Sequence, residues 1–477
     1  MTSGERFEHP LIDRYAGRDM ASLFSPRARH GVWRDLWIAL ARAESDLGLP
    51  ITDAQIAELV AHRDDFDWEA VAAYEKDLRH DVMAHVHHYG DVAPSARGII
   101  HLGATSCFVT DNADLVQYRE ALRKVARRLG RVIDALRSFA DEHRALPCLG
   151  YTHFQVAQPT TVGKRVALWI QDLLLDFDEV QRVIDWLPCR GVKGTTGTQA
   201  TFLSLFNGDH GKVKELDQMV CEAIGFSRSI PVSGQTYTRK IDSTIHHALG
   251  SIAQTASKFA NDMRLLSHEG ELEEPSEDKQ IGSSAMAYKK NPMRCERINS
   301  LSRYVMTVAE TSGQTAATQW LERTLDDSAI RRIAIPESFL AIDGILILME
   351  NVGKGIVVWP RVIERHLREQ LPFLATEEIL MAGVRAGGDR QELHEGLRVH
   401  SREAARQIKA EGRTNPLLEL LAQDPLFAAI KDRLPGLMDP AKFIGRAVEQ
   451  VEEFLTEEVG PRLEGLDLSD SSDELRV

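Results

Sequence analysis

A basic segment containing glycine and serine, residues 280–297, holds the densest set of groups that could do chemistry. Two serine hydroxyls follow a glycine, and four cationic side chains come after them: Gly282, Ser283, Ser284, Lys289, Lys290, Arg294 and Arg297. Mobile hydroxyl and cationic groups suit a lid that closes over an anionic substrate. On composition alone, a solvated hinge is an equally good interpretation of the segment.

Four histidines and an aspartate fall within the ten residues 79–88. A metal site is one interpretation, but His80 and His85 are five residues apart and would point about 140° away from each other on a helix. His85 and His88 could share a face, yet no carboxylate is spaced to complete a zinc site beside them. We therefore expect no metal here, and packing or surface roles for His85, His87 and His88.

His80 differs from the other histidines of this segment because charged residues flank it. Asp81 on one side could orient the imidazole ring. Arg79 on the other side could bind a carboxylate or a phosphate through two N–H groups. These three residues form a second candidate for a functional role.

Two polar segments precede long helical patterns, and each has a plain structural explanation beside a functional one. Residues 103–106 lead to Asp111 and Asn112, which we expect to cap a long helix. Hydroxyl and free N–H groups at such a helix start can also bind an anion. In residues 150–161, His153 lies among hydroxyl and amide side chains. It is either a general acid or base or an ordinary solvated histidine.

Apolar residues recur at helical spacing over five long stretches. These stretches are about 115–139, 162–184, 241–266, 296–320 and 328–352. Ordinary globular helices span roughly 8–20 residues, so elements of this length indicate a helical bundle. Long rods with apolar stripes usually need neighbours, which favours a symmetric oligomer. We therefore expect an all-α fold with the polar segments at the ends of its long helices.

Composition argues against several classes of protein. Apolar residues make up 43% and charged residues 27%, which is a globular balance. The net charge of −14 argues against nucleic acid or an anionic membrane as the main partner. No apolar run approaches the ~20 residues of a membrane helix, and the N-terminus is polar. The five cysteines are scattered without a C-x-x-C pair, so we expect no disulfide framework or zinc ribbon, and a cytoplasmic location.

Three of these segments resemble the signature regions of the fumarase/aspartase superfamily. Residues 282–292 are similar to the signature G-S-S-x-M-x-x-K-x-N-P, and residues 103–112 and 150–161 resemble the other two regions in the expected order. Within the superfamily, residues 79–82, 288–293 and 320–328 resemble the adenylosuccinate lyase family, as the sequences RHDV, YKKNPM and WLERTLDDS show. One departure is Ala287, where the family usually has proline. Its loss is expected to loosen the loop without removing a functional group.

The resemblance implies a C–N lyase that works without a cofactor or metal. Such an enzyme eliminates fumarate from adenylosuccinate, giving AMP, and from SAICAR, giving AICAR, in purine biosynthesis. The reaction needs a base for a C–H bond beside a carboxylate, cations and N–H donors for the resulting dianion, and an acid for the leaving nitrogen. The family pattern implies Ser283 as the base, His153 as the acid and His80 as a second histidine on the substrate. Lys289 would favour the serine alkoxide, and Glu296 would orient one of these groups.

The substrate carries a phosphate and two carboxylates, so an acidic protein needs a local basic pocket for it. The positions that the family pattern implies for substrate binding are polar or cationic: Arg14, Tyr15, Arg79, Asp81, Thr105, Ser106, Gln235, Asn291, Arg297, Arg323, Ser328 and Arg332. The resemblance further implies a homotetramer in which several chains share each active site.

We expect three domains in this fumarase/aspartase-type fold. Residues 1–111 would be an N-terminal helical domain that carries the second histidine. Residues 112–364 would be a central long-helix bundle with the signature loops, and this bundle would assemble across subunits. Residues 365–477 would be a small helical domain that ends in an acidic tail.

Other classes of protein explain parts of the sequence. An all-helical, metal-dependent phosphohydrolase is suggested by the His80-Asp81 doublet, but it leaves residues 282–293 without a role. A non-enzymatic member of the superfamily would be expected to lack Ser283 or His153, and both are present. Sister lyases that release fumarate from other substrates, such as argininosuccinate, form a third alternative.

Overall fold

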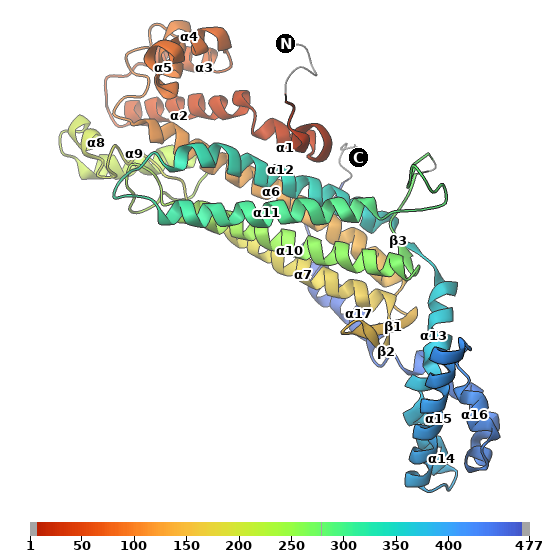
Figure 1. Ribbon diagram of the computed structural model, residues 1–477. Coiled ribbons are helices and arrows are strands. Elements are labelled where there is room, and N and C mark those ends of the chain that lie inside the picture. The colour runs from red at the N-terminus through yellow and green to blue at the C-terminus, as the bar shows by residue number, and fades with distance from the viewer. Residues whose placement is uncertain (1–6, 278, 470–477) are drawn as a thin grey trace.

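The computed structural model describes residues 7–277 and 279–469, which form an elongated and mostly helical molecule (Figure 1). The strands in this part of the chain form two short antiparallel sheets, which pair β1 (Pro147–Thr152) with β2 (Gln155–Thr161) and β3 (Leu272–Glu273) with β4 (Val357–Val358). The expected all-α class is confirmed.

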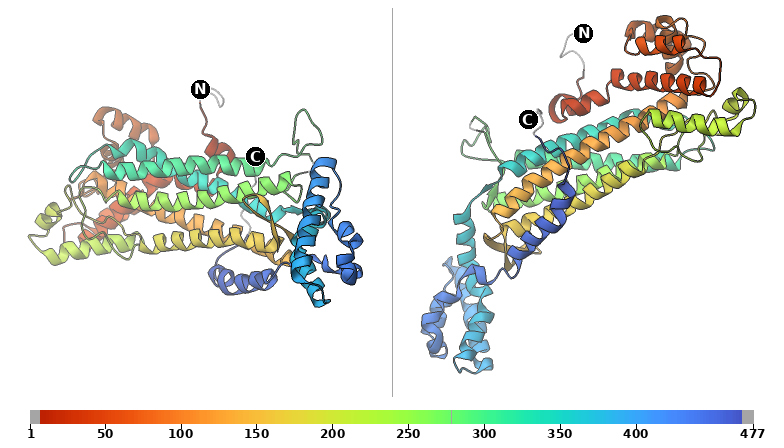
Figure 2. Two further views of the ribbon diagram at one scale, coloured as in Figure 1. Left: turned by 60° about the horizontal axis from the view of Figure 1, so that its bottom comes forward. Right: turned by 180° about the vertical axis from the view of Figure 1, so that it is seen from behind.

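Five long helices lie side by side as a rod in all three ribbon views (Figures 1 and 2). They are α6 (Ser106–Glu142), α7 (Val162–Trp186), α10 (Lys240–His268), α11 (Met293–Ala317) and α12 (Asp327–Gly355), which correspond to the five stretches predicted from apolar spacing. Their apolar stripes pack into one core, in which Leu122, Val125 and Leu129 of α6 are fully buried. At 1.5 Å per residue, the 37 residues of α6 span about 55 Å.

The start of α6 differs from the prediction, because Asp111 and Asn112 do not cap it. The helix already begins at Ser106, and both residues are buried one turn or more inside it. Asn112 Oδ1 accepts hydrogen bonds from the backbone N–H groups of Arg190 at 2.8 Å and Gly191 at 3.0 Å. The polar side chains at 111 and 112 thus make tertiary contacts.

A second core lies at the end of the rod where α6 begins. It is built around Trp33, Trp37 and Phe108. The N-terminal elements are η1 (Leu11–Tyr15), α1 (Arg18–Leu23), α2 (Pro26–Asp46), α3 (Asp53–Ala61), α4 (Trp68–Leu78) and α5 (Asp81–Val92); α8 (Ala200–Leu205) and α9 (His210–Ala223) lie at the same end of the rod (Figure 1).

A third core, around Ile379, Leu393 and Phe427, lies beyond the opposite end of the rod. The C-terminal elements are α13 (Pro360–Leu374), α14 (Thr376–Arg385), α15 (Arg390–Glu411), α16 (Leu417–Gln423), η2 (Pro425–Arg433), η3 (Pro435–Leu437), η4 (Pro440–Lys442), α17 (Ala447–Phe454), η5 (Leu455–Val459) and α18 (Gly460–Leu463). From α17 onward the chain packs back on the rod through Val451 and Val459. The last part of the expected acidic tail, 470–477, lies outside the described residues.

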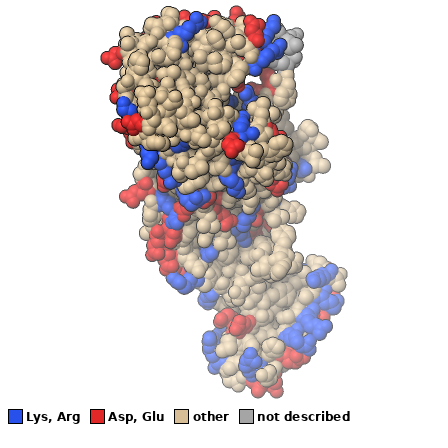
Figure 3. Space-filling model, turned by 90° about the vertical axis from the view of Figure 1, so that its left-hand side faces the viewer, with Lys and Arg blue, Asp and Glu red and all other residues tan. Residues whose placement is uncertain are grey.

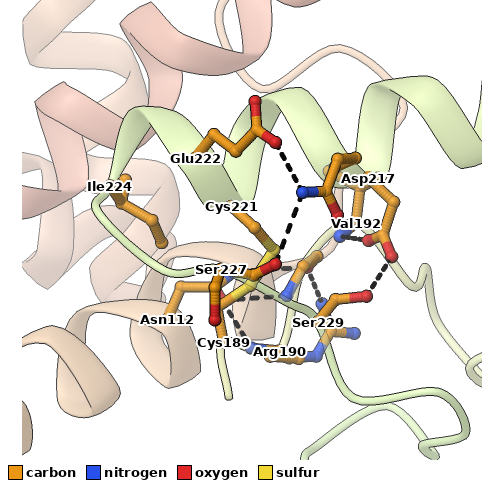
Figure 4. Close-up of a disulfide and its surroundings, with 12 residues drawn as sticks. Asn112, Cys189, Arg190, Val192, Asp217, Cys221, Glu222, Ile224, Ser227 and Ser229 are labelled. Carbon is orange, nitrogen blue, oxygen red and sulfur yellow. Dashed lines mark hydrogen bonds between the residues drawn. A yellow bond between two sulfur atoms is a disulfide. The ribbon is translucent and has the colours of Figure 1, made fainter. Parts of the chain in front are cut away.

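Cys189 and Cys221 form a disulfide between the segment after α7 and helix α9 (Figure 4). The described residues thus form one disulfide, where the sequence predicted no disulfide framework. The two residues are 32 positions apart, and nothing in that spacing identifies them as partners. The other three cysteines are free and buried. Among the described helices, none combines the length and apolar character needed to cross a bilayer.

Candidate active site

A cavity of about 340 Å³ lies at the end of the rod where α6 and α12 begin and α5 approaches them. Segments far apart in the sequence line it, and they contribute seven of the residues predicted for the site: His80, Asp81, Ser106, Gln235, Arg323, Ser328 and Arg332. Lys and Arg side chains are interspersed with Asp and Glu side chains over this end of the molecule (Figure 3). The cavity therefore combines both signs of charge with hydroxyl and amide groups.

His80 and Asp81 sit at the start of α5, where the chain turns into the helix. His80 is the N-cap, and its Nδ1 accepts a hydrogen bond from the backbone N–H of Met83 at 3.3 Å. Its other ring nitrogen lies 3.3 Å from the hydroxyl of Ser106. Asp81 accepts a hydrogen bond from Arg332 at 2.8 Å. Burial alone would raise the pKa of Asp81, but the hydrogen bond and charge of Arg332, together with the backbone N–H of Val82, outweigh it and lower the pKa.

Two further predicted residues, Arg79 and Thr105, lie next to residues of the cavity wall but do not line the cavity themselves. Arg79 ends α4 with a left-handed φ of 53° and does not line the cavity. Thr105 is the N-cap of α6, and its hydroxyl lies 3.5 Å from Nε2 of Gln235. The two residues therefore border the predicted site within this chain.

A network of buried charged residues holds the side chain of Arg323 in place. Its Nη1 donates to Asp327 at 2.8 Å, and the other oxygen of Asp327 accepts from Nε of Arg239 at 2.6 Å. Arg239 also contacts both carboxylate oxygens of Asp111 at 3.2 and 3.3 Å. Asp111 accepts a further hydrogen bond from the backbone N–H of Tyr237 at 2.9 Å. Because Arg323 is half-buried and the rest are buried, the chain presents this guanidinium to the cavity on a rigid support.

A second set of buried charges surrounds Arg331. This residue donates to Asp242 at 2.7 Å, to the hydroxyl of Tyr237 at 2.6 Å and to Asp114 at 2.9 Å. Burial would lower the pKa of Arg331, but Asp242 and the neighbouring acidic groups raise it well above its usual value. This arginine is therefore charged and fully engaged.

The sequence pattern did not identify the residues of these two networks as part of the site: Asp114, Arg239, Asp242, Asp327 and Arg331. A usable signal was present, because Asp114 and Asp242 interrupt apolar faces of long helices next to Leu115 and Ile241. A carboxylate on a buried helix face requires a partner, so such positions indicate buried ion pairs.

The other predicted residues are not brought to this cavity within the chain. His153 is at the tip of the β1–β2 hairpin, which lies at the other end of the rod (Figure 1). Helix α6 runs from the cavity towards this hairpin, and its length of about 55 Å separates the two places. Tyr15, next to Arg14 on η1, packs against Gly344 in the middle of α12. A single chain thus holds several separate parts of the predicted site.

His153 and Phe154 form the two-residue tip of the hairpin, since Thr152 pairs with Gln155. Their φ angles are 52° and 56°, so both are left-handed. Tips of this kind favour asparagine and glycine, and other side chains are strained there. Strained backbone of this sort is concentrated at functional sites, which agrees with a functional role for His153.

The segment that carries Ser283 projects from the same distant end, between β3 and α11 (Figure 1). Ser283 is partly buried, and its Oγ accepts hydrogen bonds from the backbone N–H groups of Ala285 at 3.3 Å and Met286 at 3.0 Å. Asn291 closes the loop by donating to the carbonyl of Gly282 at 2.7 Å. A Cβ atom at Gly282 would come within 2.2 Å of the carbonyl oxygen of Lys289, so only glycine fits this approach.

The base of this loop is firmly held. Glu274 accepts hydrogen bonds from the first backbone N–H groups of α11, those of Arg294 and Cys295, both at 3.0 Å. Arg294 in turn donates to Glu277 at 2.7 Å. Glu296 and Arg297 follow near the start of α11, so these two predicted residues lie at the same end of the rod as the loop.

The remaining histidines of residues 79–88 pack against other rings. His85 is buried and stacks on His30 with ring centroids 3.9 Å apart, and burial lowers its pKa to about 3. His87 stacks on Tyr74, and Nε2 of His88 accepts from the backbone N–H of Asp67 at 3.0 Å. Within residues 7–277 and 279–469, no three His, Cys, Asp or Glu side chains are grouped so that they could hold a metal ion.

Two parts of the chain match known protein families. Residues 20–307 match the family described as lyase, and residues 372–454 match that described as adenylosuccinate lyase C-terminus. The fold is similar to the 3-carboxy-cis,cis-muconate lactonizing enzyme of Pseudomonas putida, with a TM-score of 0.81 and 24% identity over 93% of this chain and 98% of that one. A fumarate lyase from Mesorhizobium has a TM-score of 0.78 and 25% identity over the same shares. The expected fumarase/aspartase-type fold is confirmed.

Relatives in sequence define the family. The chain is 50% identical to adenylosuccinate lyase of Saccharomyces cerevisiae over 467 residues, which are 97% of each chain. It is 51% identical to that of Schizosaccharomyces pombe over 460 residues, which are 96% of this chain and 95% of the relative. The chain therefore belongs to the adenylosuccinate lyase family, as the sequence motifs predict.

Proposed function

We propose that this protein eliminates fumarate from adenylosuccinate, giving AMP, and from SAICAR, giving AICAR. The observation that carries the proposal is the cavity at the start of α6 and α12. It combines the cations of Arg323 and Arg332 with the hydroxyls of Ser106 and Ser328, in a chain from a family of lyases. A phosphate and two carboxylates require such groups, because guanidinium N–H donors bind anionic oxygens in pairs.

In the proposed reaction, Ser283 takes the proton from the carbon beside a carboxylate and His153 gives a proton to the leaving nitrogen. The electron pair of the C–H bond forms the new double bond, and the C–N bond breaks with its pair on nitrogen. Lys289 favours the serine alkoxide and stabilises the dianion. His80 contacts the substrate, and Glu296 orients one of the reacting groups. The reaction needs no cofactor or metal.

We propose that a cytoplasmic homotetramer assembles each site from several chains. The length of α6 supports this, because it keeps His153 far from the cavity of its own chain. Exposed apolar side chains beside the cavity give further support: Trp320 is 73%, Leu321 99% and Leu325 72% exposed. Such side chains in a group commonly mark an interface. Arg14, Tyr15, Asn291 and Arg297 would meet the substrate in the same shared way, within three domains at 1–111, 112–364 and 365–477.

The first test measures the ultraviolet absorbance change when purified protein meets adenylosuccinate, with and without a metal chelator. Conversion to AMP and fumarate that ignores the chelator is the expected result. Conversion abolished by the chelator would redirect the assignment to metal-dependent chemistry. An intact, assembled protein that leaves adenylosuccinate and SAICAR unchanged would contradict the proposal, and argininosuccinate would then be tested.

A further inference from the structure

Arg29, near the start of α2, lines the cavity but is absent from the residues that the family pattern implies. Its side chain is 27% exposed. Its Nε is buried and has no hydrogen-bond partner among the described residues. Buried N–H groups in proteins nearly always have partners, so an unpaired one in a cavity wall requires an explanation.

The other arginines of the cavity are better paired than Arg29. Arg323 and Arg332 each donate to a carboxylate at 2.8 Å, and Arg239 donates to one at 2.6 Å. Arg29 approaches Oδ1 of Asp114 at the longer distance of 3.4 Å. A ligand anion would therefore displace less from Arg29 than from these other guanidinium groups.

Asp114 cannot satisfy Arg29 alone because a second arginine shares it. Its Oδ2 accepts from Arg331 at 2.9 Å, and Arg331, whose side chain is 11% exposed, also lines the cavity. One carboxylate thus accepts from two guanidinium groups, and its shorter contact is to Arg331, the less exposed of the two. Asp114 orients Arg29 while leaving part of its hydrogen-bonding capacity unused.

We propose that Arg29 is a further substrate-binding residue that donates hydrogen bonds, including one from Nε, to an anionic oxygen group of the ligand. The inference rests on the proposed function, which supplies ligands with phosphate and carboxylate groups. A guanidinium group matches both through paired N–H donors. The chemistry is shared by the two groups, and the two reaction products separate them, because AMP carries only the phosphate and fumarate only carboxylates.

The test compares the wild-type protein with Arg29→Gln, Arg29→Lys and Arg27→Gln. Arg27 is the matched control, since it lies two residues earlier on α2, is exposed and does not line the cavity. We measure KM for adenylosuccinate, the inhibition constants of AMP and fumarate, and calorimetric binding of AMP. Loss of a charge-assisted hydrogen bond to an anion weakens binding about 10- to 100-fold.

Arg29→Gln is expected to raise KM and one inhibition constant by that factor, and Arg27→Gln to leave all constants unchanged. A change for AMP assigns the phosphate, and a change for fumarate assigns a carboxylate. Constants within twofold of the wild type for both products would overturn the inference. If Arg29→Gln fails to assemble, Arg29→Lys decides, because it keeps the charge but loses Nε, and unchanged constants would again overturn the inference.

Failure of the proposed function gives a different result. The wild-type protein would then leave adenylosuccinate unconverted. Calorimetric binding of AMP does not depend on turnover, so it would still test whether Arg29 binds a phosphate.

Discussion

The two ends of the rod carry functional groups in opposite ways. At the cavity end, Arg323 is fixed by Asp327, which is itself held by buried Arg239. At the other end, Ser283 and His153 lie on an exposed loop and a hairpin tip, where backbone turns hold them. The residues of the cavity are therefore positioned by contacts within the chain, whereas Ser283 and His153 lie at its surface, far from that cavity.

The two ends should therefore differ in how substitutions affect stability and turnover. Side chains at the cavity end belong to buried charge networks, so changing one of them leaves a partner charge uncompensated inside the protein. At the distant end His153 is exposed, and Ser283 is partly buried with hydrogen bonds to nearby backbone N–H groups, so changing either one leaves no buried charge without its partner. Substitutions in the buried charge networks of the cavity end should therefore affect folding and binding together, while substitution of Ser283 or His153 should affect turnover with little effect on folding.

The largest effect is expected at the distant end. Ser283→Ala and His153→Ala should each lower turnover of adenylosuccinate by at least about 100-fold, because each removes a proton-transfer group. Urea unfolding should remain as in the wild type. Activity near wild type in either variant would refute the corresponding role.

Mixing the two variants sharpens this prediction. If sites combine residues from several chains, unfolding and refolding Ser283→Ala and His153→Ala together should restore part of the activity, because some sites then receive one intact copy of each group. Verified mixed assemblies without activity would count against shared sites.

Asp327→Asn should have the largest effect on folding. In the variant, Asp111 remains as the partner of Arg239, but the two arginines together carry one positive charge that no carboxylate compensates. This should lower the free energy of unfolding by about 3–5 kcal/mol and raise KM. The matched control is Asp326→Asn, because Asp326 is exposed and accepts from the hydroxyl of Thr318. Equal urea midpoints for the two variants would show that the buried network does not hold this end together.

Glu44 in α2 makes the cavity end sensitive to pH. It is fully buried, neither of its carboxylate oxygens has a partner among the described residues, and burial raises its pKa to about 8 from 4.5. Between these values the unfolded carboxyl group loses its proton while the folded one keeps it. The contribution of Glu44 to stability therefore falls as pH rises from 4.5 to about 8, by a few kcal/mol.

Glu44→Gln removes this titration. Its free energy of unfolding relative to the wild type should rise through the same pH range and stay constant above it. The measurement is urea unfolding at about pH 5 and about pH 8.5. A difference between variant and wild type that does not change with pH would contradict the buried, unpaired state of Glu44.

The smallest effect is expected at Phe154, whose ring is 50% exposed at the hairpin tip. Its φ of 56° suits glycine better than any residue with a Cβ atom. Phe154→Gly should be more stable than Phe154→Ala by about 1 kcal/mol. Equal stability in thermal unfolding would show that the tip relaxes once the ring is gone.

Regular apolar spacing made the long helices predictable, as the buried series Leu122, Val125 and Leu129 shows. The motif segments likewise identified the residues that line the cavity, including His80 and Ser106. A motif is defined by residue types and their order along the chain, and these are the same before and after folding.

Long-range pairing was not predictable from the sequence. Arg239 meets Asp111 across 128 residues and Asp327 across 88, and no local pattern marks such partners. Asp111 was interpreted as a helix cap because the same residue types serve caps and buried ion pairs. The distance between His153 and the cavity follows from the direction of α6, which is a property of the fold.

Helix α6 also limits how the gene can change in length. One inserted residue in its middle would rotate everything beyond it by about 100° and shift it by about 1.5 Å. The hairpin with His153 would then leave its position relative to the cavity end, and the buried face would turn away from its partners. Insertions and deletions should therefore accumulate in connections such as residues 412–415, between α15 and α16, while the number of residues in α6 stays fixed over long periods of descent.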